Sequence, residues 1–539
     1  MTHPVEPGLD GAGEIFGIPG DFALPLFKVI EQADILPLYT LSHEPAVGFA
    51  ADAAARYGSR LGVAAVTYGA GALNMINPVA TAYAEKSPLV VISGAPGAGE
   101  GADGLGLHHQ VKHLNSQRMI MNEVTIAQCV LNDAELAPAE ISRVLTAARE
   151  FSRPVYIEFP RDMVGKPARP VPAFKDRTGE TRDAAMACAA EILERLEAAE
   201  RPALLLGVEI RRFDLEAKVA ELARKLQIPA ATSFMGRGIL AETDAHVVGT
   251  YLGLAGETDV RRTIEHSDGL LMLGVILCDT NFGVSRRQID MRQAIHAFDG
   301  EVQIGHHTYR GVNLPDLIDA LLERGRALGA GGDSRREDYP TGLEHDDEPI
   351  TPSDIAKAVN DAFAEHGPMP ISSDMGDCLF TAMDMVHTPM VAPGYYATMG
   401  PGVPAGLGLQ TASGLRPLIL VGDGAFQMTG WELGNCGRYG WNPIVLLFNN
   451  TAWGMLKAFQ KDTGYNDLDT WGFAAMAAGL GGHGVRVSTR RDLATALSAA
   501  IDDDSQFHLI EVMIPCDALS RTLTRFTSAL AEKSGLSQQ

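Results

Sequence analysis

Short apolar runs alternate with helical stretches along most of the chain, a pattern that predicts parallel sheets flanked by helices. The first group of runs that read as buried strands is EIFGIPG, GVAAVTYGAG, PLVVISGAP and PVYIEFP. A second group is PALLLGVEI, IPAATSF, GLLMLGVIL and AIHAFDG, and a third is MPISSDMGD, PLILVGDGAF, NPIVLLFNN and FHLIEVMIP. Each group fits one α/β unit built on a doubly wound parallel sheet.

Two stretches without apolar periodicity separate the three groups, and both read as linkers. The first, PRDMVGKPARPVPAFKDRTGETR, is rich in proline and charge. The second, GRALGAGGDSRREDYPTGLEHDDEP, combines glycine with charges of both signs. Because 539 residues are too many for one ordinary core, we expect three domains, at residues 1–165, 183–325 and 350–539.

Composition and charge narrow the class of protein. Hydrophobic residues make up 46% and charged residues 21%, which is typical of a globular protein with large buried sheets. A net charge of −23 argues against nucleic acid or an anionic membrane as a partner. The six cysteines form no CxxC pair and read as reduced core thiols. Without a signal-peptide pattern or an apolar run of about 18 residues, the expected location is the cytoplasm.

The third group contains the most informative spacing in the chain. GDG at 422–424 follows one apolar run, and NN at 449–450 follows the next. One helix and a return strand between them would bring both motifs to the carboxyl edge of a parallel sheet, where ligands bind. Asp423 and Asn450 can then share one cation, and the two glycines let the backbone approach a diphosphate. Taken alone, either motif is more often an ordinary turn or strand end.

Together the two motifs resemble the signature of thiamine-diphosphate enzymes. The resemblance implies that Asp423 and Asn450 bind Mg²⁺ with the carbonyl of Ala452. It further implies cofactor contacts in the GDG motif and in three other matching runs, VTYGAGALNM, DMGDCLF and APGYYATMGPGVPAG. The implied contact residues are Gly422, Gly424, Ala425, Thr67, Asp377, the carbonyl of Ala397, and Met399. Met399 would hold the cofactor in a bent shape.

Thiamine chemistry also requires a carboxylate in an apolar setting, hydrogen-bonded to N1′ of the cofactor's pyrimidine. In LSHEPAVGFAADAAARYG, Glu44 stands at the start of an alanine-rich helix. By itself such a residue is usually a partner of the helix dipole. Beside the motifs of the third group, Glu44 is instead interpreted as the acid that activates the cofactor.

The resemblance places Asp21 of FGIPGD and the pair His108 and His109 of LHHQ in the same active site. Imidazoles that titrate near neutral pH suit proton transfer to the product. The second pair, His306 and His307, lies in no matching context and receives no role. No HxxxH or HExxH spacing indicates a zinc site.

The nearest branch is inferred from one departure and several matches. Members that resemble pyruvate decarboxylase have a glutamate shortly after NN, where this chain has Leu456, and the more apolar pocket favours an aryl side chain. The runs GDFALP, APGYYATMG and GDGAFQMTGWELGNC are similar to bacterial phenylpyruvate decarboxylases, a branch that also handles indolepyruvate. The implied assembly is a homodimer at minimum, with a homotetramer usual.

Three alternatives remain open from the sequence. A carboligase or synthase of the same superfamily would join two carbonyl compounds, and some synthases carry a flavin in the middle domain. A broad-range 2-oxo acid decarboxylase would accept aliphatic substrates as well. A nucleotide-binding or regulatory α/β protein with a degenerate site would release no CO2.

Overall fold

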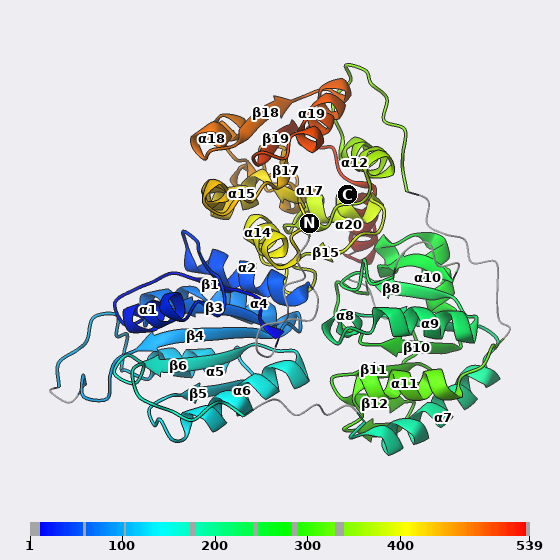
Figure 1. The fold of residues 1–539 in the computed structure, drawn as a ribbon. Coiled ribbons are helices and arrows are strands. Elements are labelled where there is room, and N and C mark those ends of the chain that lie inside the picture. The colour runs from blue at the N-terminus through cyan, green and yellow to red at the C-terminus, as the bar shows by residue number, and fades with distance from the viewer. Residues whose placement is uncertain are drawn as a thin grey trace.

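The computed structural model describes residues 11–57, 61–101, 104–172, 179–240, 246–282, 289–328 and 339–534, which form three α/β lobes (Figure 1). The first ten residues, parts of both expected linkers and two residues of the glycine-rich run before His108 lie outside the described residues. Each lobe contains one sheet covered by helices. The expected fold class, three doubly wound α/β domains, is therefore confirmed.

The first sheet is parallel throughout, in the strand order β2-β1-β3-β4-β6-β5. Its strands are β1 (Ile15–Gly17), β2 (Leu38–Thr40), β3 (Gly62–Val66), β4 (Leu89–Ala95), β5 (Ala127–Val130) and β6 (Val155–Pro160). The helices are α1 (Leu24–Ala33), α2 (Glu44–Arg56), α3 (Ala70–Asn74), α4 (Ile76–Ala84), α5 (Ser116–Asn122) and α6 (Ala137–Phe151). The central strands β3 and β4 are almost fully buried, as apolar runs covered on both faces must be.

The third sheet repeats this topology, with the order β15-β14-β16-β17-β19-β18. Its strands are β14 (Ile371–Ser373), β15 (Met390–Val391), β16 (Leu418–Gly422), β17 (Ile444–Asn449), β18 (His483–Val487) and β19 (His508–Met513). The helices are α12 (Pro352–His366), α13 (Asp377–Thr381), α14 (Gly402–Ser413), α15 (Asp423–Thr429), α16 (Cys436–Tyr439), α17 (Gly454–Phe459), α18 (Phe473–Gly479), α19 (Arg490–Asp502) and α20 (Arg521–Ser534). A 3-10 segment, Gly430–Asn435, connects α15 to α16.

The middle sheet has the order β13-β12-β11-β10-β7-β8-β9. Its strands are β7 (Pro202–Leu206), β8 (Ala230–Ser233), β9 (Val247–Tyr251), β10 (Gly269–Leu273), β11 (Ile295–Phe298), β12 (Glu301–Ile304) and β13 (His307–Arg310). The helices are α7 (Arg182–Ala198), α8 (Glu209–Arg212), α9 (Glu216–Leu226), α10 (Thr258–Glu265) and α11 (Leu314–Arg324). Strands β12 and β13 are antiparallel, so this sheet departs from the fully parallel expectation, and His306 and His307 lie at their hairpin turn.

The first and third lobes share a hydrophobic core, whereas most of the middle lobe has a core of its own and Phe234, Leu252 and Ala255 of that lobe pack into the third lobe. One buried cluster joins Phe16 and Val47 of the first lobe to Val403 and Leu447 of the third. At its centre α2 lies against α14 so closely that a Cβ on Gly408 would meet the backbone oxygen of Ala50 at 2.1 Å. The two lobes that carry the expected site residues are therefore packed as one unit.

No helix in the described part of the chain combines the length and the apolar composition needed to cross a membrane.

Candidate active site

The GDG and NN motifs lie at the same edge of the third sheet. Strand β16 ends at Gly422 and α15 begins at Asp423, while the neighbouring β17 ends at Asn449. The two strands run parallel with Gly422 paired to Phe448, so their carboxyl ends lie side by side. The topology that the spacing predicts is therefore present.

The carboxylate of Asp423 reaches the turn that follows Asn450. Burial raises the pKa of Asp423 to about 6, and the backbone amides of Gly424, Thr451 and Ala452 oppose this shift. The Ala452 amide also donates to Oδ1 of Asn450 at 3.1 Å. The side chains of Asp423 and Asn450 thus converge on one backbone segment, which fits a shared divalent cation.

Three glycines around these side chains leave space or allow close packing. A Cβ on Gly422 would meet no atom within 4 Å, so the backbone is open toward the sheet edge. A Cβ on Gly424 would meet the Trp453 ring at 2.3 Å, and one on Gly454 would meet Nδ2 of Asn450 at 2.2 Å. An open backbone beside a buried acid fits a diphosphate and its metal ion.

Asp374 organises the segment that contains Ala397 and Met399. Its fully buried carboxylate accepts hydrogen bonds from the amides of Gly400 at 3.0 Å and Gly402 at 2.7 Å. Burial raises the pKa of Asp374 to about 6 despite these amides. Asp374 thus fixes the backbone directly after Met399, which is half-buried against the shared core, and Ala397 in the same segment has a φ of +59°.

Asp377, expected among the cofactor contacts, is engaged elsewhere in the chain. Its carboxylate accepts hydrogen bonds from the amide of Ser520, at 2.9 Å, and from the Ser520 hydroxyl. Burial raises its pKa to about 6, although both hydrogen bonds oppose the shift. The observed contact of Asp377 is thus with the residue just before α20.

Glu44 is the first residue of α2 and lies over the short helix α3 of its own lobe. Its Oε2 accepts a hydrogen bond from Nδ2 of Asn74 at 3.0 Å, and a Cβ on Gly71 would lie 3.3 Å from its Oε1. Thr67, at the end of β3, is buried, and its hydroxyl has no partner within the described part of the chain. A free polar atom and an acid thus stand at neighbouring positions of this sheet edge.

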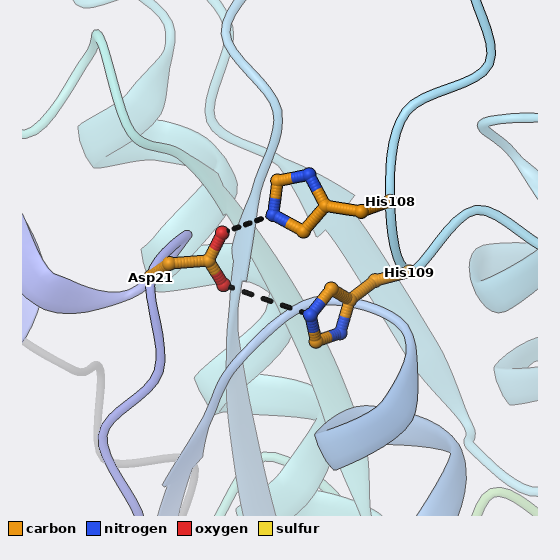
Figure 2. Close-up of side chains that lie close together, drawn as sticks. All are labelled: Asp21, His108 and His109. Atoms are coloured by element: carbon orange, nitrogen blue, oxygen red, sulfur yellow. Dashed lines mark hydrogen bonds and ion pairs between the residues drawn. The ribbon is translucent and has the colours of Figure 1, made fainter.

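The structure brings Asp21, His108 and His109 together, as expected (Figure 2). His108 and Asp21 share a hydrogen bond, and Nε2 of His109 lies 3.9 Å from the other carboxylate oxygen. Desolvation raises the pKa of Asp21, but the hydrogen bond with His108 outweighs it and holds this pKa below its usual value. Within the described residues, these three side chains form the group whose metal-ligand-type atoms all lie within 4.8 Å of one another.

Comparisons with known protein families match all three lobes. Residues 10–119 match the N-terminal thiamine pyrophosphate (TPP) binding domain of thiamine pyrophosphate enzymes, residues 189–321 their central domain, and residues 374–512 their C-terminal TPP binding domain. The indole-3-pyruvate decarboxylase of Azospirillum brasilense is 58% identical over 96% of this chain and 95% of its own length. The chain belongs to the thiamine-diphosphate-dependent 2-oxo acid decarboxylases. The expected family is thus confirmed.

More distant relatives of this decarboxylase also span nearly its whole length. The alpha-keto-acid decarboxylase of Mycobacterium avium (strain 104) is 29% identical over 95% of this chain and 93% of its own. That of Mycobacterium tuberculosis (strain H37Rv) is 28% identical over 97% of this chain and 95% of its own. The similarity therefore covers all three lobes rather than the cofactor motifs alone.

A buried network that the sequence did not reveal supports the histidine segment of the decarboxylase. Oε1 of Gln117 accepts a hydrogen bond from the Gly69 amide at 2.5 Å, and its amide group donates to Ser93 and Tyr156. Gly69 has a φ of +66°, and a Cβ there would meet the backbone oxygen of His109 at 2.2 Å. Only glycine fits this approach of two backbone segments.

Asn449, the first residue of the NN motif, is structural in this decarboxylase. Its buried Nδ2 donates to Glu511 at 2.7 Å and to Thr470 at 3.2 Å. Glu511 is itself buried and also accepts from Arg486 at 2.8 Å. Because these partners lie far apart in the chain, no local signal could have found them.

Leu456, the expected pocket residue, lies on α17 just beyond the turn that follows Asn450. Its side chain is 53% exposed in the single chain, and Phe459 on the same helix is 42% exposed. The decarboxylase therefore presents apolar side chains close to the sheet edge that carries Asp423 and Asn450.

Proposed function

We propose that this decarboxylase converts an aromatic 2-oxo acid, indole-3-pyruvate or phenylpyruvate, to the aldehyde and CO2 with thiamine diphosphate and Mg²⁺. One observation carries the substrate class: the 58% identity, over 96% of the chain, to a relative named indole-3-pyruvate decarboxylase. The apolar residues Leu456 and Phe459 support an aryl substrate, because burying an aromatic ring contributes on the order of 2 kcal/mol.

Residues of the third lobe would hold the cofactor. Asp423, Asn450 and the carbonyl of Ala452 supply the hard oxygen ligands that Mg²⁺ prefers, and the backbone from Gly422 through Gly424 to Ala425 faces the diphosphate. The bound cofactor supplies the electron sink for the bonding pair left behind when CO2 departs. The buried position of Asp423 and the open backbone at Gly422 support this assignment.

Residues of the first lobe would handle protons. Glu44 would hydrogen-bond N1′ of the pyrimidine with Thr67 nearby, and Ala397 and Met399 of the third lobe would support the rest of the ring system. Asp21, His108 and His109 would supply the proton to the product carbon and assist aldehyde release. Their observed proximity supports a common proton-handling group.

We expect the active form to be a homodimer or a homotetramer in the cytoplasm. Glu44 of one subunit would meet the metal site of its partner, so each dimer would contain two composite sites.

Steady-state assays with thiamine diphosphate and Mg²⁺ test the proposal on a panel of indole-3-pyruvate, phenylpyruvate, pyruvate and branched-chain 2-oxo acids. We expect the highest kcat/KM for the two aromatic acids, with the aldehyde as the product. Comparable values for the aliphatic acids would instead support a broad-range enzyme, which the alpha-keto-acid decarboxylase relatives favour. Ligated hydroxyketones as the main product would indicate a carboligase.

A further inference from the structure

The segment that leads into Glu44 is tied to the third lobe by side chains. Strand β2 ends at Thr40, whose amide donates a hydrogen bond to the Tyr439 hydroxyl at 2.7 Å. Nη1 of Arg438 donates to the Thr40 hydroxyl, also at 2.7 Å. The ring of Tyr39 packs on that of Tyr439, with centroids 5.0 Å apart. The end of β2 is therefore held from α16, a helix of another lobe.

Ser42, two residues before Glu44, is also hydrogen-bonded to the third lobe. Oε2 of Glu432 accepts hydrogen bonds from the Ser42 amide at 3.0 Å and from Nδ2 of Asn435 at 2.9 Å. The same Nδ2 lies 3.1 Å from the Ser42 hydroxyl, to which it donates. Both the backbone and the side chain of Ser42 are thus fixed by the segment Gly430–Asn435.

Glu432 is an unusual choice of residue if its only role is to link the two lobes. Its side chain is fully buried, and Oε1 has no hydrogen-bond partner within the described part of the chain. Burial raises its pKa to about 7, while the backbone amides of Ser42 and His43 and the side chain of Asn435 oppose the shift. Burying a carboxylate lowers the stability of the folded chain, so a buried Glu432 next to the segment that leads into Glu44 suggests a function for this residue.

We propose that Glu432 is a positioning residue for Glu44. By fixing Ser42, it sets the place and direction from which Glu44 presents its carboxylate to the cofactor. The inference rests on the proposed role of Glu44. Glutamine is a poor substitute, because its amide group is a donor that must find an acceptor in a buried site where the Ser42 amide and Asn435 already donate.

The direct readout is the exchange rate of the proton at C2 of bound thiamine diphosphate, measured in D2O without substrate. This rate depends on Glu44 and needs no turnover. In Glu432→Gln we expect it to fall about tenfold to a hundredfold, the effect typical of losing a partner that orients a catalytic group. Cofactor affinity should change far less, because the diphosphate and metal contacts remain. Wild-type exchange in this variant overturns the proposal.

Two variants separate the possible failures. Glu44→Gln should exchange slowly; if it exchanges at the wild-type rate, the proposed role of Glu44 itself is wrong. If Glu44→Gln is slow but Glu432→Gln is not, only the positioning role fails. The matched control Glu194→Gln changes an exposed residue of α7 in the middle lobe and should exchange like the wild type.

Further variants decide the question if Glu432→Gln does not fold. Glu432→Asp keeps the charge but withdraws it from Ser42, and Asn435→Ala removes the second contact; both should exchange more slowly than the wild type. In the cofactor-free protein, backbone amides of residues 41–46 should exchange with deuterium faster in either variant, as measured by mass spectrometry. Unchanged C2 exchange in both variants overturns the proposal.

Discussion

At the scale of single residues, aspartates with the same side chain differ in pKa because their surroundings differ. Asp423 and Asp374 are buried, and burial raises the pKa of each to about 6. Asp21 is partly exposed and hydrogen-bonded to His108, so its pKa is lowered despite desolvation. The two buried acids are therefore protonated more easily than Asp21, which is ionised at neutral pH.

Replacing Glu44 with glutamine should remove cofactor activation but not metal binding. We expect kcat to fall by about 10²–10⁴-fold, the usual contribution of a general acid or base. The Mg²⁺ concentration that half-saturates cofactor binding should change little, because Asp423 and Asn450 are untouched. Turnover is followed by CO2 release and cofactor binding by protein fluorescence. Wild-type turnover would refute the assignment.

Asp374 should make stability depend on pH. Its pKa rises from the unfolded value of 3.8 to about 6, so the folded chain binds this proton more tightly than the unfolded chain. The stabilisation is complete below 3.8 and is lost as the pH rises through about 6. Between those values the wild type should lose about 1.4 kcal/mol per pH unit relative to Asp374→Asn.

Urea unfolding of both proteins at pH 5 and pH 7.5 measures this difference. Asp374→Asn lacks the titrating group, so its stability should fall less, or rise more, than that of the wild type between the two pH values. Parallel changes in the two unfolding midpoints would show that Asp374 does not titrate in this range.

Some site residues could be predicted from the sequence because they belong to contiguous motifs. Asp21, His108 and His109 meet as expected. Asp374, Glu432 and Gln117 were missed, since each acts through hydrogen bonds to backbone amides that are distant in the chain. One sequence carries no record of such contacts, and an isolated acid or amide looks the same on a surface as in a core.

At the scale of elements, the strands that the sequence predicted are mostly those buried on both faces. Every apolar run named as a strand is one, including β3, β16 and β17. The strands without such a run lie mainly at sheet edges, where one side is exposed; β2, β5, β13, β15 and β18 are examples. Edge strands need no continuous apolar sequence, so they are harder to predict from the sequence than the central strands.

The turn between β16 and α15 tolerates a side chain at one glycine but not at the other. In Gly424→Ala the new Cβ would meet the Trp453 ring at 2.3 Å, and overpacking of this kind costs about 1–3 kcal/mol. We expect a lower urea midpoint for the cofactor-free protein.

Two neighbouring glycines provide the controls for this prediction. Neither Gly422→Ala nor Gly437→Ala places its Cβ within 4 Å of another atom, so neither should lower the urea midpoint. Only Gly422→Ala should also weaken cofactor binding, because its methyl group enters the space assigned to the diphosphate. A wild-type midpoint for Gly424→Ala would mean that Trp453 moves aside.

At the scale of the whole molecule, the first and third lobes share one strand order and one core, while the middle lobe has a different strand order and is built mainly on its own core (Figure 1). The middle lobe also carries the antiparallel hairpin β12–β13, which breaks the strictly parallel pattern. The residues Glu301–Ile304 alternate between exposed and buried, so the period-two signal was present, but the segment is too short to stand out.

Mixing two inactive variants tests whether the active site spans two subunits. When Glu44→Gln and Asp423→Ala chains are co-expressed, a composite site can form from the intact Glu44 of one chain and the intact Asp423 of the other. With random pairing, about one quarter of all sites should be intact, and activity should return to about that level. If each site lay within one chain, the mixture would stay inactive, as each variant alone should be.

The close approach of Gly408 to Ala50 limits how the molecule can move. No side chain separates α14 from α2 there, so neither helix can slide without a backbone collision. Motion of the first lobe relative to the third would have to break this contact. A rearrangement that keeps it intact would instead take place in the loops around the sheet edges.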